Sequence, residues 1–319
     1  MSQFFFNQRA SLVNDVIEGT IIASPWNNLA RLESDPAIRV VVRRDLNKNN
    51  VAVISGGGAG HEPAHVGFIG KGMLTAAVCG DLFASPSVDA VLTAIQAVTG
   101  EAGCLLIVKN YTGDRLNFGL AAEKARRLGY NVEMLIVGDD ISLPDNKQPR
   151  GIAGTILVHK VAGYFAERGF NLATVLREAQ YAANHTASIG VALASCHLPQ
   201  EADSAPRHQA GHAELGMGIH GEPGIARRPF TNLDTLVGDM FNELADNTPY
   251  GRTLRHWDRA SGSWQEEHTF IEPFNKGDRV IALVNSLGGT PISELYGVYG
   301  RLATLCEEAG IHLVRNLIG

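Results

Sequence analysis

Four glycines and a histidine form the part of this sequence best suited to holding a polar ligand against the backbone. The run 51–63 reads VAVISGGGAGHEP, in which four glycines within five residues precede His61. We expect a strand, a glycine-rich turn and a helix that begins at about Pro63, because this arrangement directs backbone N–H groups at a polar or anionic ligand. The alternative is a tight turn that binds nothing.

A second polar cluster follows the apolar run 104–109. The run 109–114 reads KNYTGD, in which Asp114 is a candidate base and Lys109 a candidate cation for oxygen or phosphate groups. Because ligands of parallel α/β sheets bind beyond the carboxyl ends of the strands, we expect this cluster and the glycine run to converge on one crevice. An ordinary solvated loop is the alternative.

His220 is the third candidate for contact with a ligand. It stands in the run 216–224, GMGIHGEPG, where the surrounding glycines leave room for a ligand at the imidazole ring. A lone surface histidine is usually inert, so a His220 without a function is the alternative on these residues alone. His65 is at most a support for His61.

Three known motifs are matched only in part. The run from His61 to His65 reads HEPAH, but the zinc pattern H-E-x-x-H needs both histidines on one face of a continuous helix. Proline costs roughly 3 kcal/mol inside a helix, so a helix from Pro63 leaves His61 outside it and we expect no metal site. The run 216–221 has G-x-G-x-x-G without a following helix, and 67–72 lacks the first glycine and the hydroxyl of a P-loop. We recognise no other nucleotide site.

Short apolar runs alternate with helical patterns over the first 187 residues. The expected strands are 40–45, 51–55, 74–79, 104–109 and 132–137, and the expected helices are 87–98, 119–128, 155–168 and 171–184. Near-continuous apolar strands between helices indicate an α/β sheet that is covered on both faces. Asn171 is the expected N-cap of the last of these helices.

A second set of elements follows a boundary that we place near residue 187. It comprises strands 188–195, 279–285 and 311–318, helices 232–245 and 291–309, and the loop that carries His220. The predicted fold class is therefore α/β, with two α/β domains, residues 1–187 and 188–319, each a sheet flanked by helices. Because the sequence stops inside an apolar run, we expect the second domain to be incomplete at its C-terminus.

The composition is that of an ordinary globular protein, with 45% hydrophobic and 19% charged residues. The formal net charge of -6 argues against a nucleic-acid or anionic-membrane partner. The N-terminus has no signal-peptide pattern, and no apolar run reaches the roughly 18 residues of a membrane helix. The four cysteines form no C-x-x-C pair. We therefore expect a cytoplasmic protein with reduced thiols.

The runs GGGAGHEP, KNYTGD and ELGMGIHGEPG, in this order, resemble the dihydroxyacetone kinase family, specifically its substrate-binding K subunit or domain. The segment 280–296, VIALVNSLGGTPISELY, extends the resemblance over nearly the whole chain. In that family a histidine of the GIHGEPG segment attacks the ketone carbon and holds dihydroxyacetone as a covalent hemiaminal. By resemblance that residue is His220. The family's substrate contacts map onto Gly58, Ala59, Gly60, His61, Lys109 and Asp114, with His61 and Asp114 as the acid/base pair.

The resemblance also implies partners. The family places Mg-ATP or Mg-ADP on a separate helical L unit, either fused or a partner subunit, so we expect no cofactor on this chain. It further implies a homodimer. Some family members are ligand-sensing coregulators that keep the covalent histidine and lose the catalytic residues. Retention of His61 and Asp114 beside His220 favours the kinase.

Two features depart from the family pattern. The glycine run commonly reads G-G-G-S-G-H, whereas position 59 is Ala59, so a backbone donor remains but a hydroxyl is lost. Residues 1–200 look more like the fused ATP-dependent type, and those after His220 look more like the stand-alone subunit. The sequence therefore leaves the phosphoryl donor open.

Overall fold

The computed structural model describes residues 5–32, 35–143, 148–194, 210–246, 249–258 and 260–319. The first half of the chain forms a six-stranded sheet of order β1-β2-β4-β3-β5-β6. Its strands are β1 (Leu29–Arg31), β2 (Arg39–Arg43), β3 (Ala52–Ala59), β4 (Ala76–Leu82), β5 (Cys104–Lys109) and β6 (Val132–Val137). The strands β4, β3, β5 and β6 run parallel, whereas β1 and β2 are antiparallel to their neighbours. The carboxyl ends of β3 and β5 therefore lie side by side.

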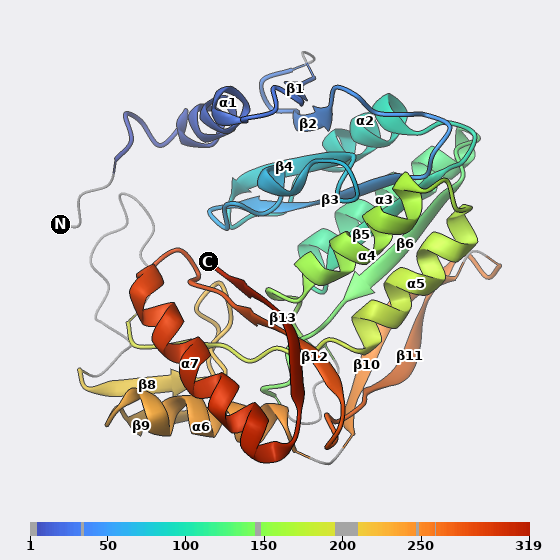
Figure 1. Cartoon of the computed structure of the whole chain (residues 1–319). Coiled ribbons are helices and arrows are strands. Elements are labelled where there is room, and N and C mark those ends of the chain that lie inside the picture. The colour runs from blue at the N-terminus through green and yellow to red at the C-terminus, as the bar shows by residue number, and fades with distance from the viewer. Residues whose placement is uncertain (1–4, 33–34, 144–147, 195–209, 247–248, 259) are drawn as a thin grey trace.

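Helices cover both faces of this sheet (Figure 1). Strand β5 illustrates this burial on both faces. Leu105 and Ile107 pack in one hydrophobic core, and Leu106 and Val108 pack in the other. The helices α4 (Thr155–Glu167) and α5 (Leu172–Asn184) close the first core, together with α1 (Leu12–Ala23). The helices α2 (Val88–Val98) and α3 (Thr112–Arg127) close the second. The α/β class and the expected strands are confirmed, as is the N-cap Asn171, whose side chain accepts a hydrogen bond from the backbone of Thr174.

The helix expected from Pro63 is wrong. Strand β3 continues through the glycines to Ala59, and after turns the chain forms only the short 3-10 helix η1 (Val66–Phe68). Glycine makes the longer strand possible, since a Cβ at Gly56 would lie 2.3 Å from the carbonyl oxygen of Val78 on β4. The residues after Pro63 include a β-branched residue and two glycines, which are poor helix formers.

The helix expected over 119–128 begins earlier than predicted. Helix α3 starts at Thr112, so the predicted base Asp114 lies in its first turn and not in a loop. Tyr111 precedes it in an extended conformation. Polar residues occupy this first turn, so the spacing of apolar residues did not predict that it is helical.

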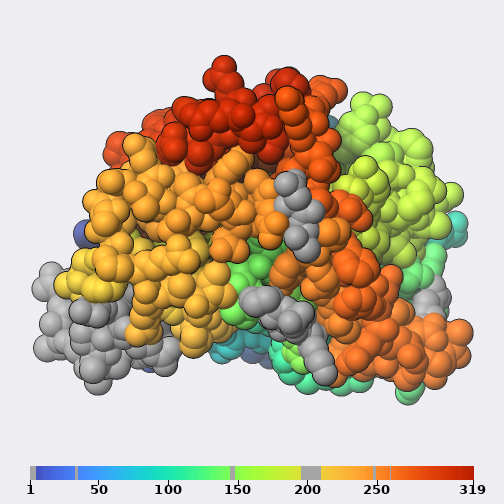
Figure 2. All heavy atoms as spheres, turned by 90° about the horizontal axis from the view of Figure 1, so that it is seen from below, coloured from blue at the N-terminus to red at the C-terminus, as the bar shows by residue number. Residues whose placement is uncertain are grey.

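The second half distributes its strands over three small sheets. These are β7 (Val191–Ala192), β8 (His212–Leu215) and β9 (Ala226–Pro229); the hairpin β10 (Tyr250–Asp258) and β11 (Ser263–Ile271); and the parallel pair β12 (Arg279–Val284) and β13 (His312–Ile318). The predicted helices are confirmed as α6 (Leu233–Leu244) and α7 (Ile292–Ala309). The strand expected over 188–195 is shorter than predicted within its described part, which ends at residue 194. Seen from below, the second half, yellow to red, covers most of the face (Figure 2).

The hairpin β10–β11 packs back onto the first half of the chain. The side chain of Arg252 is only 1% exposed and donates to the carbonyl oxygens of Gly138 and Ala183. Leu254 joins the core beneath α2 and α3. The boundary near residue 187 stays a prediction, and residues beyond it complete the edge of the first sheet.

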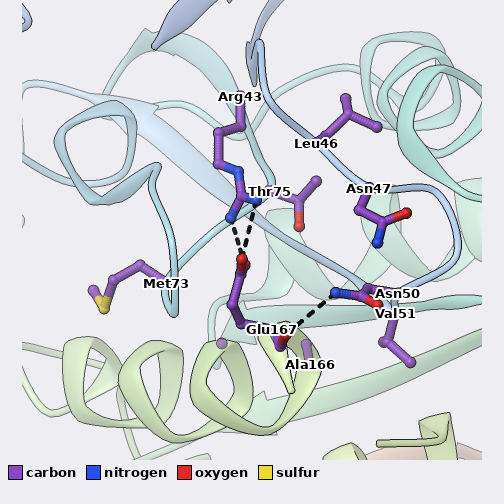
Figure 3. Close-up of a pocket in the computed structure, with 10 residues that line it drawn as sticks. Arg43, Leu46, Asn47, Asn50, Val51, Met73, Thr75, Ala166 and Glu167 are labelled. Carbon is purple, nitrogen blue, oxygen red and sulfur yellow. Dashed lines mark hydrogen bonds and ion pairs between the residues drawn. The ribbon is translucent and has the colours of Figure 1, made fainter. Parts of the chain in front are cut away.

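A polar hollow between β2 and α4 is closed by ion pairs (Figure 3). Arg43 lies with its Nη1 2.7 Å from Glu167 Oε2 and its Nε 2.8 Å from Asp45 Oδ1. The hollow has a volume of about 20 Å³, which suits a water molecule and nothing larger. The ion pair between Arg43 and Glu167 therefore ties β2 to α4. Among the described helices, none combines the length and apolar character needed to cross a bilayer.

Candidate active site

Two of the predicted residues, far apart in sequence, meet at the carboxyl end of β3. The Nε2 atoms of His61 and His220 lie 3.0 Å apart. His61 follows β3, and His220 lies in the loop between β8 and β9. On its other side, His220 Nδ1 lies 3.1 Å from Glu222 Oε1. The glycine run and the GIHGEPG loop therefore share one site, as the sequence predicted.

The pKa values of Glu222 and His61 both lie below those of the free side chains. Burial by itself raises the pKa of Glu222, but hydrogen bonds from His220 outweigh it and hold the pKa at about 2. Glu222 is then a carboxylate, which can only accept a hydrogen bond. Burial lowers the pKa of His61 to about 3, with Lys109 and His220 acting in the same direction. His61 is therefore a neutral imidazole.

The cluster that follows β5 borders the same site. Lys109 and Asp114 are both buried, 5% and 6% exposed. Burial raises the pKa of Asp114, while a hydrogen bond from Ser85 and the charges of Lys109 and His220 act against it. Burial also lowers the pKa of Lys109, and Asp114 opposes that shift. Asp114 thus lies within electrostatic reach of both Lys109 and His220, and its Oδ1 has no hydrogen-bond partner among the described residues.

Gly58 and Ala59 end β3 and Gly60 follows it, and the substrate contacts of these three residues stay a prediction. A Cβ at Gly58 would lie 2.6 Å from the backbone nitrogen of Ala84, so only glycine fits there. Gly60 has a φ of +95°, which also favours glycine, and its N–H donates to the carboxylate of Glu62 at 3.0 and 3.2 Å. Ala59 is 6% exposed and packs in the core under α4 and α5. Its methyl group therefore faces the core.

Aromatic rings enclose the two histidines. Phe83 lies 4.8 Å from His61 and 5.5 Å from His220 between ring centroids, and Tyr111 lies 4.8 Å from His220. These rings limit the access of water and leave the imidazoles partly buried. The sequence gave no signal for Phe83, which lies in a turn after β4 with a φ of +53°.

Buried polar side chains fix the loop that carries His220. Arg150 lies with its Nε 2.5 Å from Asp140 Oδ2, and its Nη2 donates to the carbonyl oxygen of Gly216 at 2.6 Å. At the other end of the loop, Glu214 accepts from the backbone N–H of Gly224 at 2.9 Å. Both ends of the loop are therefore held by charged groups. None of these supports was predicted.

His65 does not support His61 directly. Its ring is buried behind the glycines of β3, with Nδ1 3.5 Å from Ser55 Oγ and its centroid 5.3 Å from that of His159. His61 instead contacts His220, so the two histidines of HEPAH have different partners. The described part of the chain contains no group of three side chains able to hold a metal ion. The G-x-G-x-x-G run joins two antiparallel strands, β8 and β9, and opens no helix.

The fold and this site are those of an α/β domain with a histidine pair at a strand end. A family model described as the Dak1 domain matches residues 21–319, and the chain belongs to this family. The dihydroxyacetone kinase of Citrobacter freundii is 71% identical over 304 residues, which cover 95% of this chain and 50% of that protein. A crystal structure of the C. freundii kinase matches with a TM-score of 0.85 and 68% identity, covering 100% of this chain and 54% of that one.

Two further relatives differ in their described roles. The dihydroxyacetone-binding subunit DhaK of the PEP-dependent dihydroxyacetone kinase of Escherichia coli is 47% identical, over 97% of this chain and 88% of that subunit. The dihydroxyacetone kinase operon co-activator Dha-DhaQ matches in structure with a TM-score of 0.81 and 32% identity, over 96% of this chain and 86% of that one. The chain thus spans about half of the C. freundii kinase and most of the smaller relatives.

Proposed function

We propose that this chain is the substrate-binding part of a dihydroxyacetone kinase and binds the ketone covalently through His220. The observation that carries the proposal is the pair of Nε2 atoms 3.0 Å apart, with the Glu222 carboxylate at the far nitrogen of His220. That arrangement leaves Nε2 of His220 with a lone pair directed at the site. A lone pair on a neutral imidazole can add to a carbonyl carbon.

The covalent bond explains how the site selects its ligand. A ketone has a central carbon that His220 can attack, whereas glycerol has the same carbon chain and no carbonyl. The backbone of Gly58, Ala59 and Gly60 lines the strand end, and Lys109 supplies a cation for the hydroxyl oxygens. Once the ketone carbon is fixed, a terminal hydroxyl group is held in one orientation for phosphorylation.

The pKa shifts favour Asp114 as the base that takes the proton of the terminal hydroxyl. Burial raises the pKa of Asp114, which makes its carboxylate a stronger base than one in water. The pKa of His61 is lowered to about 3 by burial, so His61 is a weak base. We assign His61 instead as the N–H donor to the ligand oxygen, and Asp114 as the general base of phosphoryl transfer.

The phosphoryl donor belongs to another unit in this proposal. A nucleotide with Mg²⁺ on an L-type domain or subunit would supply the cationic groups that phosphoryl transfer needs. The E. coli relative is described as the binding subunit of a PEP-dependent kinase, while this chain spans half of the C. freundii kinase. A separate donor subunit and a donor domain fused in the same chain are both compatible with a substrate-binding unit that does not itself bind the nucleotide. A homodimer and a cytoplasmic location are part of the same proposal.

A crystal of the chain soaked with dihydroxyacetone tests the covalent step. We expect continuous density between the central carbon of the ligand and Nε2 of His220, and no such density in the His220→Ala variant. Glycerol soaked at the same concentration serves as the control and is expected to give no joined density. A ketone bound at this site without a bond to His220 would contradict the proposal.

Turnover separates the kinase from a ligand-sensing coregulator, which the likeness to the co-activator makes the second candidate. The chain is mixed with an L-type partner, Mg-ATP and dihydroxyacetone, and dihydroxyacetone phosphate is measured. The kinase proposal expects product that depends on both proteins. Covalently bound ketone without product would favour the coregulator.

A further inference from the structure

Glu222 makes two hydrogen bonds to one residue. Its Oε2 accepts from the backbone N–H of His220 at 2.9 Å, and its Oε1 lies 3.1 Å from Nδ1 of the same residue. The intervening Gly221 has a φ of +78°, which turns the chain so that residue 222 folds back under residue 220. The imidazole is thus held from its own loop, independently of His61.

We propose that Glu222 is the positioning residue of this site: it holds His220 in the tautomer that carries its proton on Nδ1 and so keeps the Nε2 lone pair free to attack a carbonyl. The opposite tautomer would place the Nδ1 lone pair 3.1 Å from a carboxylate oxygen, where neither atom has a proton to share. The proposal rests on the proposed function, because the tautomer matters only if Nε2 bonds to the ligand.

His61 completes the arrangement on the other side. Its Nε2 lies 3.0 Å from Nε2 of His220, and one of these two nitrogens has to donate. With His220 fixed by Glu222, the donor is His61. Addition of a ketone therefore replaces this hydrogen bond, and the freed N–H of His61 is left beside the new oxygen of the adduct.

The proposed role of Glu222 also accounts for the protons when the ketone adds to Nε2 of His220. The Nε2 lone pair becomes the C–N bond, and the π pair of the carbonyl becomes a lone pair on its oxygen. The ring then carries a positive charge, which the Glu222 carboxylate stabilises through its contact with the protonated Nδ1. One proton from solvent reaches the ligand oxygen. The adduct therefore contains every atom of the ketone and the imidazole plus that proton, and reversal returns the proton to solvent.

The tautomer of His220 is measurable in the ligand-free chain by nitrogen-15 NMR with labelled histidine. The His220→Asn spectrum identifies the signals of this ring among those of the other histidines. We expect a protonated Nδ1 and an unprotonated Nε2 in the unsubstituted chain. A protonated Nε2 would overturn the proposal without any need for a Glu222 variant.

The Glu222→Gln variant tests the dependence on the carboxylate. Its amide can turn an N–H toward Nδ1, which favours the unreactive tautomer. We expect a mixed or reversed tautomer and an adduct equilibrium constant about 10- to 100-fold lower, the range of a charge-assisted hydrogen bond. The adduct is followed by carbon-13 NMR of dihydroxyacetone labelled at its central carbon, which changes from a carbonyl to a tetrahedral carbon.

The Asp239→Asn variant is the matched control. Asp239 on α6 pairs with Arg228 at 3.0 Å, outside the loop of His220, so this variant removes one carboxylate elsewhere. We expect its tautomer and adduct constant to equal those of the unsubstituted chain. An unchanged tautomer and adduct constant in Glu222→Gln would refute the positioning role. Absence of the adduct in the unsubstituted chain would instead refute covalent capture, and the ligand-free spectrum would still decide the tautomer.

Discussion

At the scale of single residues, the site contains groups whose pKa values are shifted by burial. Asp114 and Lys109 approach each other in a largely dry environment, and His61 stays neutral beside them. Each of the three would behave differently in water. In the proposed function they act as a base, a cation and an N–H donor around the imidazole of His220.

Replacing Asp114 by asparagine separates binding from turnover. The amide keeps the shape of the side chain but cannot take a proton, so we expect the ketone still to bond to His220. Phosphorylation should fall about 100- to 10,000-fold, the usual contribution of a general base. Product formation is measured with an L-type partner and Mg-ATP, and adduct formation by carbon-13 NMR. Turnover equal to that of the unsubstituted chain would remove Asp114 from its assigned role.

The sequence predicted which residues approach one another but not how their protons are arranged. His220, His61, Lys109 and Asp114 were all named from motifs at strand ends. Glu222 was not, because its contact with His220 depends on the positive φ of Gly221, and spacing alone does not reveal such a turn. Roles for these residues stay predictions until ligand binding is measured.

At the scale of elements, the glycines of β3 differ in how much space is available for a Cβ atom. A Cβ at Gly56 would meet the carbonyl oxygen of Val78 at 2.3 Å, and that oxygen belongs to the backbone of β4 and cannot turn away. At Gly57 the nearest atom would be His65 Nε2 at 3.6 Å, an ordinary contact. The two neighbours therefore differ in their tolerance of a methyl group.

Gly56→Ala should destabilise the fold by about 1–3 kcal/mol, the cost of overpacking a well-filled interior. Gly57→Ala, the control in the same strand, should change the free energy of unfolding by less than about 1 kcal/mol. Urea unfolding followed by circular dichroism gives both values. Equal destabilisation by the two substitutions would show that close strand packing is not the reason for Gly56.

Strands with almost continuous apolar runs were predicted accurately, whereas the hairpin β10–β11 was not. Strands β5 and β6 have the predicted bounds because their apolar runs are almost continuous. The hairpin β10–β11 was missed because run 250–258, YGRTLRHWD, mixes charged and aromatic residues along a strand with only part of one face covered. Its pairing depends on contacts with distant residues of the first half.

At the scale of the whole molecule, three histidines with lowered pKa values make the fold sensitive to acid. Burial lowers the pKa of His159 and of His61 to about 3, and that of His65 well below its usual value. In the unfolded chain each has a pKa near 6.5. Below that pH the unfolded state binds protons that the folded state does not, so stability falls from pH 6.5 down to about 3.

His159→Leu should reduce this sensitivity, because His159 is fully buried and neither ring nitrogen has a partner in the described structure. Between pH 7.5 and pH 5 the variant should lose about 2 kcal/mol less stability than the unsubstituted chain. Urea midpoints at the two pH values measure the difference. His312→Leu, an exposed position on β13, is the control and should keep the full acid loss. An equally acid-sensitive His159→Leu chain would contradict the assignment.

The guanidinium of Arg252 has a consequence for the order in which the molecule is made. It binds the carbonyl oxygen of Gly138, 114 positions earlier in the chain. Synthesis therefore completes β6 and Gly138 well before the side chain that donates to the Gly138 carbonyl oxygen exists. Until Arg252 is made, that oxygen needs water as its hydrogen-bond partner.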